Sequence, residues 1–568
     1  MRVNPRLRAR PMLVAAIAWV ALLLGSCDRP AAYPADASPT REAERLYAQA
    51  RELRDQLDIT RSRGASETPA GAPRAELAER YAAAHAELSR ALDPGALAAA
   101  PAEDARASAL MRRALERELA LADPASDADA EREPDCEYDP ERVAEGPEGE
   151  AALSQRVYAC FSRAARTLSL DGEELDRLTI FGRLALNDDP AQREALWHAL
   201  APLWESVDGV AGAPSPYRTL VRKRAARLRE HGEQLGESVR AIGVEPAAME
   251  SWLVSVLEMW HAITLDRPIE PWDFAHQAGR ASRALQGRVP LAALRPINDR
   301  FYRELGADPI ALDVQYDLAP RASKDPVAFT TFGRRPRLDG DATLPGEPWV
   351  FASYRIGGLD NLAELLHETG HAIHIAAIRT RPAFADWPDS DIFTEAIADL
   401  ASLEMYEPAW QQRYLGESAP LQAGIAAKYA SIVMDMAWSL FELRLYREPE
   451  RDPNEVWAEI TQRYFRIRAH PELAWWAVRG QLIDSPGYML NYAAGAILVA
   501  DLRAELRRRQ GPFDAGDPGW YQRVSESLYR FGLERPSQQV IEDFLGRPVS
   551  PRALLDDLQR ASRGARPG

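Results

Sequence analysis

Apolar residues recur every three to four positions over most of the chain, which is the spacing of amphipathic helices. Segments 41–59, 74–92 and 101–121 alternate charged faces with Ala and Leu. Helical spacing returns between residues 151 and 261 and again beyond residue 420. The pattern predicts a mainly α fold, a large assembly of many helices.

The spacing changes between residues 312 and 356. Two short runs there, Val327 to Phe332 and Trp349 to Ile356, are bounded by Pro and Gly and suit strands. We therefore expect a small β-sheet just before the next helix. An unpaired edge strand can bind an extended peptide through backbone hydrogen bonds. The run 349–356 is the candidate for that edge.

The helix expected after this sheet contains residues 365–374, which read LLHETGHAIH. Positions i and i+4 lie on one helical face, so His367 and His371 can offer two imidazoles to one metal ion. Glu368 then falls near the coordination position where water would bind. With nine His in 568 residues, chance would give about 0.02 copies of this pattern. It predicts a metal-assisted hydrolase.

Two further residues of this helix suggest packing. Glycine inside a helix costs about 1 kcal/mol relative to alanine, so Gly370 predicts a close approach by backbone or substrate. His374 lies one turn beyond His371, and we expect it to pack or to form a supporting hydrogen bond rather than to bind metal.

A second helix is expected over residues 391–403, with Asp391 as its N-cap. Glu395 and Asp399 lie four residues apart beside its apolar stripe. A bound cation would give Glu395 a partner, and Asp399 could accept the second ring N–H of a ligating histidine. The alternative is a solvated acidic edge without a metal.

His367-Glu368-x-x-His371, followed 24 residues later by Glu395-Ala-Ile-Ala-Asp399, resembles the angiotensin-converting-enzyme type of peptidyl dipeptidase. The continuation Gly-His-Ala-x-His is similar to the thimet-type oligopeptidases. These are glutamate-zincin peptidases with mainly helical, channel-shaped folds, and the resemblance is strongest over residues 265–560. It implies Zn²⁺ held by His367, His371 and Glu395, with Glu368 as general base and Asp399 behind a ligand.

Tyr488 and Tyr492 lie four residues apart in SPGYMLNYAAG, and a phenol near the metal could donate a hydrogen bond to the developing oxyanion. The Gly-Tyr-x-x-x-Tyr pattern resembles oligopeptidases and implies this role for Tyr492, with Tyr488 nearby. The alternative is a packed aromatic stripe. The family's second donor, a His shortly before these tyrosines, is absent here, and His470 is a distant substitute. Arg479 could bind a peptide's terminal carboxylate or lie free on the surface.

Residues 1–26 combine four arginines, an apolar run from Met12 to Leu24 and a small-residue exit, which predicts an export signal. Leu-Gly-Ser-Cys27 resembles a bacterial lipobox and implies lipidation of Cys27, hence a membrane-anchored, periplasm-facing lipoprotein. An uncleaved anchor or a plain secretory signal is the alternative. Residues 27–40 form a small, Pro-rich tether.

With Cys27 lipidated, Cys136 and Cys160 remain as an even pair for a disulfide in an oxidising compartment. Residues 41–150 form an N-terminal helical region that ends in an acidic, Pro-rich loop. Residues 151–568 are then the zinc peptidase catalytic region. With the chain divided in this way, the complete metal motif lies within residues 151–568.

The net charge of −16 becomes about −20 once the four signal arginines are removed, and no basic stripe is present, which argues against nucleic acid as a partner. The expected partners are oligopeptide substrates. The sequence thus predicts a zinc metallopeptidase that cleaves oligopeptides as a peptidyl dipeptidase or an oligoendopeptidase. A catalytically silent lipoprotein that binds zinc and peptides is the alternative.

Overall fold

The computed structural model describes residues 39–64, 71–92, 102–117, 149–209, 215–264, 267–321, 324, 328–339 and 342–563. The predicted export signal, Cys27, most of the tether and Cys136 lie outside these residues, so the predictions about them stay predictions. None of the helices within the described ranges combines the length and apolarity needed to cross a membrane.

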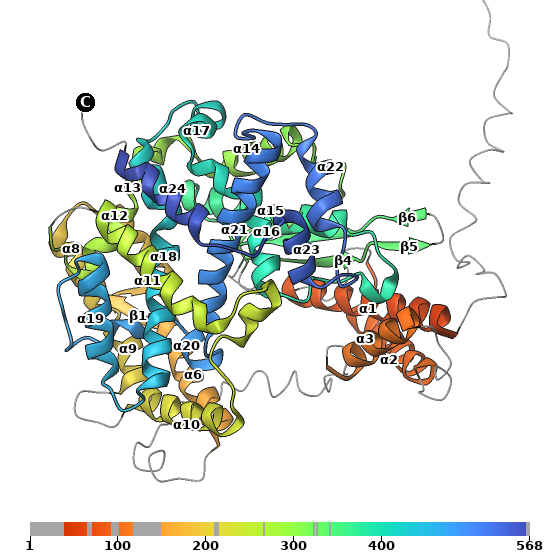
Figure 1. Cartoon of the computed structure of the whole chain (residues 1–568), viewed down its shortest axis with the longest axis horizontal. Helices are drawn as coiled ribbons and strands as arrows, with labels where there is room; N and C mark the ends of the chain where they lie inside the picture. Colours follow the sequence, from red (N-terminus) through yellow and green to blue (C-terminus); the bar gives the residue numbers. More distant parts are fainter. Residues whose placement is uncertain are drawn as a thin grey trace, which may run out of the picture.

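Three helices open the described chain: α1 (Pro39–Ser62), α2 (Arg74–Ala91) and α3 (Ala102–Arg117). They share a small apolar core of their own, to which Phe384 from a distant loop contributes. Figure 1 shows them together at one side of the molecule. These helices therefore form a unit that contacts the rest of the chain along one face.

The region after residue 149 is a dense array of helices built around one continuous apolar core that runs from Leu153 to Leu558. The helices before the sheet are α6 (Glu150–Arg166), α7 (Arg177–Leu186), α8 (Pro190–His198), α9 (Ala201–Asp208), α10 (Pro216–His231), α11 (Pro246–Ile263), α12 (Phe274–Ala278), α13 (Arg280–Ala284) and α14 (Leu294–Glu304). Those after it are α15 (Leu359–Ala377), α16 (Asp391–Ser402), α17 (Pro408–Leu415), α18 (Leu421–Arg447), α19 (Pro453–Phe465), α20 (Gln481–Asp484), α21 (Tyr488–Gln510), α22 (Trp520–Val524), α23 (Ser537–Leu545) and α24 (Arg552–Arg563).

Short helical turns connect these helices. They are η1 (Glu237–Ile242), η2 (Pro271–Asp273), η3 (Gln286–Arg288), η4 (Leu291–Ala293), η5 (Pro382–Phe384), η6 (Leu403–Tyr406), η7 (Trp475–Val478) and the π turn η8 (Ser525–Tyr529). Many helix starts follow local chemistry. Pro190, for example, begins α8 directly after Asp189, whose carboxylate accepts the Ala191 N–H at 3.0 Å.

The strands are few and short: β1 (Leu168–Leu170), β2 (Glu173–Leu175), β3 (Gln315–Asp317), β4 (Phe329–Arg334), β5 (Arg337–Asp339), β6 (Ala342–Leu344) and β7 (Glu347–Phe351). Three of them form a sheet in the order β3-β7-β4, with β3 parallel and β4 antiparallel to β7. The expected small sheet before the metal helix is therefore present, and the predicted fold class is confirmed.

The predicted edge strand was wrong. The run 349–356 contributes β7, which has a partner on both sides, and it leaves the strand after Phe351. Within the described residues β4 forms an edge of this sheet. Hydrophobic alternation cannot distinguish a central strand from an edge strand, because both bury one face.

The N-terminal helices contact the helical region after residue 149 through buried ion pairs. Arg51 of α1 donates to Asp386 at 2.7 Å, and Arg335 pairs with both Asp55 of α1 and Asp386, each at 2.7 Å. All four side chains are largely buried. Removing one partner of such a pair leaves an uncompensated buried charge, which destabilises a protein by about 3–5 kcal/mol.

Cys160, in α6, is buried and disulfide-bonded. Cys136, its expected partner, lies outside the described residues. The specific Cys136–Cys160 pairing stays a prediction.

Candidate metal centre

Helix α15 carries the His-Glu-x-x-His motif through the middle of the molecule (Figure 1). Most of its side chains from Leu359 to Ala377 are buried, and the buried set includes the polar residues Glu368, Thr369, His371 and His374. It begins after Gly358, whose φ of +117° suits glycine. Asp360 lies in the first turn of the helix and accepts a hydrogen bond from Ser282 at 3.1 Å.

Helix α16 supplies the carboxylates. Its N-cap is Ser390, whose Oγ accepts the Phe393 N–H at 3.3 Å, so the predicted cap at Asp391 was one residue late. Both residue types are good caps, and spacing alone did not separate them. Glu395 and Asp399 lie one turn apart on the side of α16 that faces α15.

Two helices can bring these groups together only if their backbones approach closely. A Cβ atom built on Gly370 would lie 2.1 Å from the carbonyl oxygen of Ala398, well inside any tolerated contact. The close approach expected at Gly370 is therefore made by the backbone of α16. This close contact between the two helices holds His367 and His371 opposite Glu395.

Three donor atoms converge at this crossing. Nε2 of His367 lies 3.4 Å from Oε2 of Glu395, and Nε2 of His371 lies 3.8 Å from the same oxygen. Each of the three residues offers one donor atom, and all these atoms lie within 4.8 Å of one another. Ligands about 2.1 Å from a tetrahedral zinc ion lie about 3.4 Å apart. The set therefore fits a zinc ion better than it fits direct hydrogen bonds, which are shorter.

Asp399 orients the first histidine. Its Oδ1 lies 2.8 Å from Nδ1 of His367 and also accepts the Ser402 hydroxyl at 2.6 Å. Burial opposes a charge on His367, but Asp399 and Glu395 outweigh it and raise the pKa of this imidazole. Burial likewise disfavours the Glu395 carboxylate, but the two histidines outweigh it and lower the pKa of Glu395. A carboxylate behind a ligating histidine fixes its tautomer and leaves Nε2 for the metal.

The small sheet positions Glu368. Thr330 of β4 and Tyr316 of β3 both pair with Val350, so their side chains share the sheet face that meets α15. Thr330 Oγ1 lies 2.7 Å from Oε2 of Glu368, and the Tyr316 hydroxyl lies 3.0 Å from Oγ1 of Thr369. The Thr330 hydroxyl, which also lies 2.9 Å from the backbone carbonyl oxygen of Glu368, thus contacts one carboxylate oxygen of this residue.

His374 is excluded from the metal cluster. Its ring packs on Trp387 and Tyr529, with ring centroids 5.6 and 5.2 Å away. Burial, reinforced by His371, lowers its pKa to about 3, which keeps it neutral. Trp387 also packs edge-on against His371 at 5.5 Å. His374 therefore packs, as expected, behind the site.

Tyr488 and Tyr492 lie in the first turns of α21, which packs against α16. Their rings meet edge to face with centroids 5.2 Å apart. Burial raises both pKa values, and the charge of Glu395 raises both further. Both hydroxyls remain protonated at neutral pH and are available as hydrogen-bond donors.

His470 lies elsewhere. Its Nδ1 contacts Glu472 at 2.7 Å and its Nε2 contacts Glu270 at 3.0 Å, so both ring nitrogens are already engaged by carboxylates. The suggestion that His470 completes the oxyanion site was wrong. Arg479 is half-buried and pairs with Asp435, so it is not free on the surface.

Sequence reasoning missed Thr330, Ser402 and Trp387, which contact Glu368, Asp399 and His371 respectively. Ser402 lies three residues after Asp399, so helical spacing could have suggested it. The other two come from a strand and a loop that no local spacing connects to the motif.

Comparisons with known proteins show a likeness of fold. The sequence matches no protein-family model, and no curated protein matches it. The M32 carboxypeptidase from Deinococcus radiodurans R1 superimposes with a TM-score of 0.52 at 16% identity, over 92% of this chain and 98% of that one. Metallocarboxypeptidase 1 of Trypanosoma cruzi superimposes with a TM-score of 0.50 at 15% identity, over 92% of this chain and 99% of that one. PZ peptidase A with inhibitor 2 superimposes with a TM-score of 0.52 at 13% identity, over 92% of this chain and 97% of that one.

Proposed function

We propose that this protein is a zinc-dependent metallopeptidase that hydrolyses peptide bonds of oligopeptides. The observation that carries the proposal is the convergence of His367, His371 and Glu395 beside Glu368, on two helices that a glycine allows to touch. The likeness of fold to carboxypeptidases and to a PZ peptidase supports it. The sequence motifs that resemble those of thimet-type and angiotensin-converting-enzyme-type peptidases are part of this proposal.

The residues that would hold zinc are the two imidazoles, through Nε2, and the Glu395 carboxylate. Such a set leaves a fourth position open, as catalytic zinc sites require. A bound zinc ion supplies Lewis acidity that polarises the scissile carbonyl and lowers the pKa of a water molecule. Asp399 keeps the His367 ring in the orientation and tautomer that this binding needs.

Glu368 would act as the general base. Thr330 holds its Oε2, which leaves Oε1 to take the proton from the attacking water and later deliver it to the departing amine. The hydroxyl also limits rotation of the carboxylate, so the base stays oriented toward the donor cluster. Correct orientation of a base contributes to rate without any change in its chemistry.

Tyr492 and Tyr488 would donate hydrogen bonds to the oxyanion that develops on the scissile carbonyl. Removal of one such donor typically lowers kcat by about 10²–10³. Their raised pKa values keep both protons in place under neutral and mildly alkaline conditions. His470 cannot share this task, since carboxylates occupy both of its nitrogens.

The experiment that tests the proposal combines metal analysis of the purified protein with a quenched-peptide assay, before and after chelation and zinc return. We expect about one zinc per chain, cleavage that chelator abolishes, and recovery with zinc. Glu368→Gln should retain zinc and lose at least about 10³-fold in kcat. Zinc binding without cleavage in the wild type would instead establish the alternative, a silent peptide-binding protein.

We also propose that the chain is exported and anchored to a bacterial envelope membrane by lipid on Cys27. The support is the basic, apolar and small-residue order of residues 1–27. Metabolic labelling with palmitate tests this directly. Label should be incorporated by the wild type and lost in Cys27→Ser, which should also leave the membrane fraction.

A further inference from the structure

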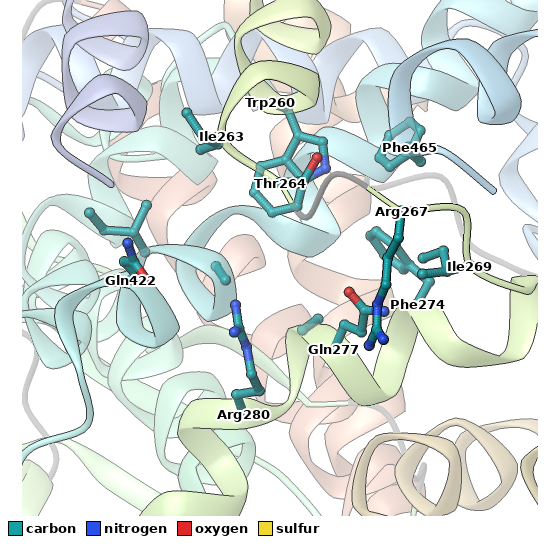
Figure 2. A pocket seen from close by; sticks show the side chains of 13 residues that line it. Trp260, Ile263, Thr264, Arg267, Ile269, Phe274, Gln277, Arg280, Gln422 and Phe465 are labelled. Atoms are coloured by element: carbon teal, nitrogen blue, oxygen red, sulfur yellow. The ribbon is translucent and has the colours of Figure 1, made fainter. Parts of the chain in front are cut away.

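A cavity of about 330 Å³ is lined by residues of α11, α12, α18 and α19 and of the segments between them. In Figure 2, Trp260 and Phe465 lie at the top of the view, with Gln277 and Arg280 below them. Trp260, Phe465 and Ile425 are buried, so much of the wall is apolar. Small-molecule sites occupy about 300–1,000 Å³. The cavity therefore suits a small molecule with an apolar group.

The walls of this cavity are held by contacts between distant segments. The rings of Phe274 and Phe465 meet edge to face, with centroids 5.5 Å apart. The Ile269 N–H donates to the carbonyl of Arg466 at 3.0 Å, and the Ile269 carbonyl accepts the N–H of Arg468 at 2.9 Å. The cavity is thus formed by tertiary packing and not by one loop.

Two arginines, Arg267 and Arg280, border the cavity and are exposed to solvent. Neither side chain forms a hydrogen bond or an ion pair with the part of the chain that the structure describes. Acidic residues outnumber Lys and Arg by 85 to 69, so an arginine can usually find a carboxylate. Arg283, for example, lies 3.9 Å from Asp188. Two positive charges therefore remain without a partner among these residues, beside an apolar cavity.

Gln277 adds a neutral polar group to the same cavity. Its side chain is half-buried and forms no hydrogen bond with the described residues. Guanidinium groups bind carboxylates and phosphates through paired, charge-assisted hydrogen bonds, and a few polar groups in an apolar pocket fix a ligand's orientation. An apolar interior with a cationic border suits a ligand that has an apolar group at one end and a negative charge at the other.

Helix α12 separates this cavity from a larger one, of about 510 Å³, that borders the metal helix, and Phe274 and Ala278 line both. No residue that lines the smaller cavity comes from α15, α16 or α21. Gly279, directly after α12, allows this wall to approach α7, since a Cβ atom on it would lie 2.9 Å from the carbonyl oxygen of Ala185. The smaller cavity is therefore a site separate from the metal centre.

We propose that the smaller cavity binds a small amphiphilic anion. Its apolar group lies among Trp260, Ile425 and Phe465, and its carboxylate or phosphate lies at Arg267 and Arg280. The chain carries a net charge of −16, so the two arginines supply a local attraction for anions that the overall charge does not. This site goes beyond the proposed peptidase function and does not depend on it.

Calorimetry on the zinc-loaded protein tests the site with three probes that share a phenylpropyl group: phenylbutyrate, phenylpropyl phosphate and the uncharged phenylbutyramide. The better of the two anions should bind about 10-fold more tightly than the amide. This is the lower end of the range for a charged hydrogen bond, because water screens the exposed arginines. The stronger anion identifies the head group, and added salt should weaken its binding but not that of the amide.

Two variants locate the binding. Arg267→Gln combined with Arg280→Gln should remove the advantage of the anion over the amide. Ala426→Phe, which fills the cavity from α18, should remove binding of all three probes. Arg229→Gln is the matched control, since Arg229 is an exposed arginine of α10 that lines neither cavity, and it should bind as the wild type does.

Three results would overturn the proposal: no binding of any probe, equal affinity of the wild type for anions and amide, or an anion advantage that persists in the double arginine variant. The last result is expected if the anion binds the zinc ion instead. The two arginines are exposed, so their replacement should leave the fold intact. If Ala426→Phe does not fold, the double arginine variant alone decides.

Discussion

Gly370 of the metal helix faces the carbonyl oxygen of Ala398 so closely that a Cβ atom on it would lie 2.1 Å away. The contact falls between His367 and His371 on one helix and between Glu395 and Asp399 on the other. The separation of the three metal donors therefore depends on the absence of one methyl group.

Gly370→Ala should force α15 and α16 apart. Overpacking of this kind costs about 1–3 kcal/mol, and the displaced carboxylate should bind zinc less tightly. Chemical denaturation and zinc titration measure the two effects. Gly182→Ala is the matched control, because Gly182 is an exposed helical glycine with no atom near its missing Cβ; it should gain about 0.5–1 kcal/mol. Unchanged zinc affinity in Gly370→Ala would contradict the role given to this contact.

Asp399→Asn should weaken zinc binding by about 10- to 100-fold, since the amide cannot replace the carboxylate behind His367. Competition with a chromophoric chelator gives the affinity. Ser402→Ala removes only the hydroxyl that donates to Asp399, so its effect should be smaller and of the same sign. A larger loss in Ser402→Ala than in Asp399→Asn would show that the hydroxyl has another task.

Tyr492→Phe should lower kcat by about 10²-fold with little change in zinc content, because the phenol acts on the transition state. Tyr488→Phe should be milder or equal. The control is Tyr464→Phe, since the buried Tyr464 hydroxyl has no hydrogen-bond partner among the described residues. Steady-state kinetics on one peptide suffices. Wild-type kcat in both Tyr488→Phe and Tyr492→Phe would remove the phenols from the mechanism.

Glu442 should make stability depend on pH. It is fully buried, accepts the Gly487 N–H at 2.9 Å, and burial raises its pKa to about 8. The unfolded chain loses this proton near pH 4.5, whereas the folded chain keeps it until about pH 8, so the stabilisation is present at low pH and is lost as pH rises between these values.

Glu442→Gln should therefore match the wild type near pH 4.5 and exceed it above pH 8. The excess should approach about 1.4 kcal/mol for each tenfold difference in proton affinity between the folded and unfolded chains. Urea unfolding at both pH values measures the difference. An advantage of equal size at the two pH values would assign the effect to packing and not to ionisation.

Helical spacing was enough to predict which side chains would meet on one face. His367 with His371, and Glu395 with Asp399, depend on a period that any helix imposes. The contacts of Thr330 and Trp387 depend on how a sheet and a loop pack on that helix, which no local pattern encodes. A strand was predicted over 349–356, and the structure has one at Glu347–Phe351. Its central position was not predicted, because pairing order is decided by distant segments.

His470 illustrates a different limit. Its chemistry suits an oxyanion donor, and only the fold reveals that Glu270, two hundred residues earlier, and Glu472 engage both nitrogens. The same holds for Arg479, whose carboxylate partner Asp435 lies on the separate helix α18. Chemical character can be read from single residues, whereas their partners depend on tertiary structure.

The buried ion pairs between α1 and the loop before α16 limit how far this protein can be shortened. Arg51 and Asp55 compensate Asp386 and Arg335, and Asp386 immediately precedes Trp387, which packs on His371. A fragment that starts at residue 149 would carry the entire metal motif, but Arg335 and Asp386 would keep only each other and lose their buried partners Asp55 and Arg51. A minimal recombinant enzyme should therefore retain the helices from residue 39 onward.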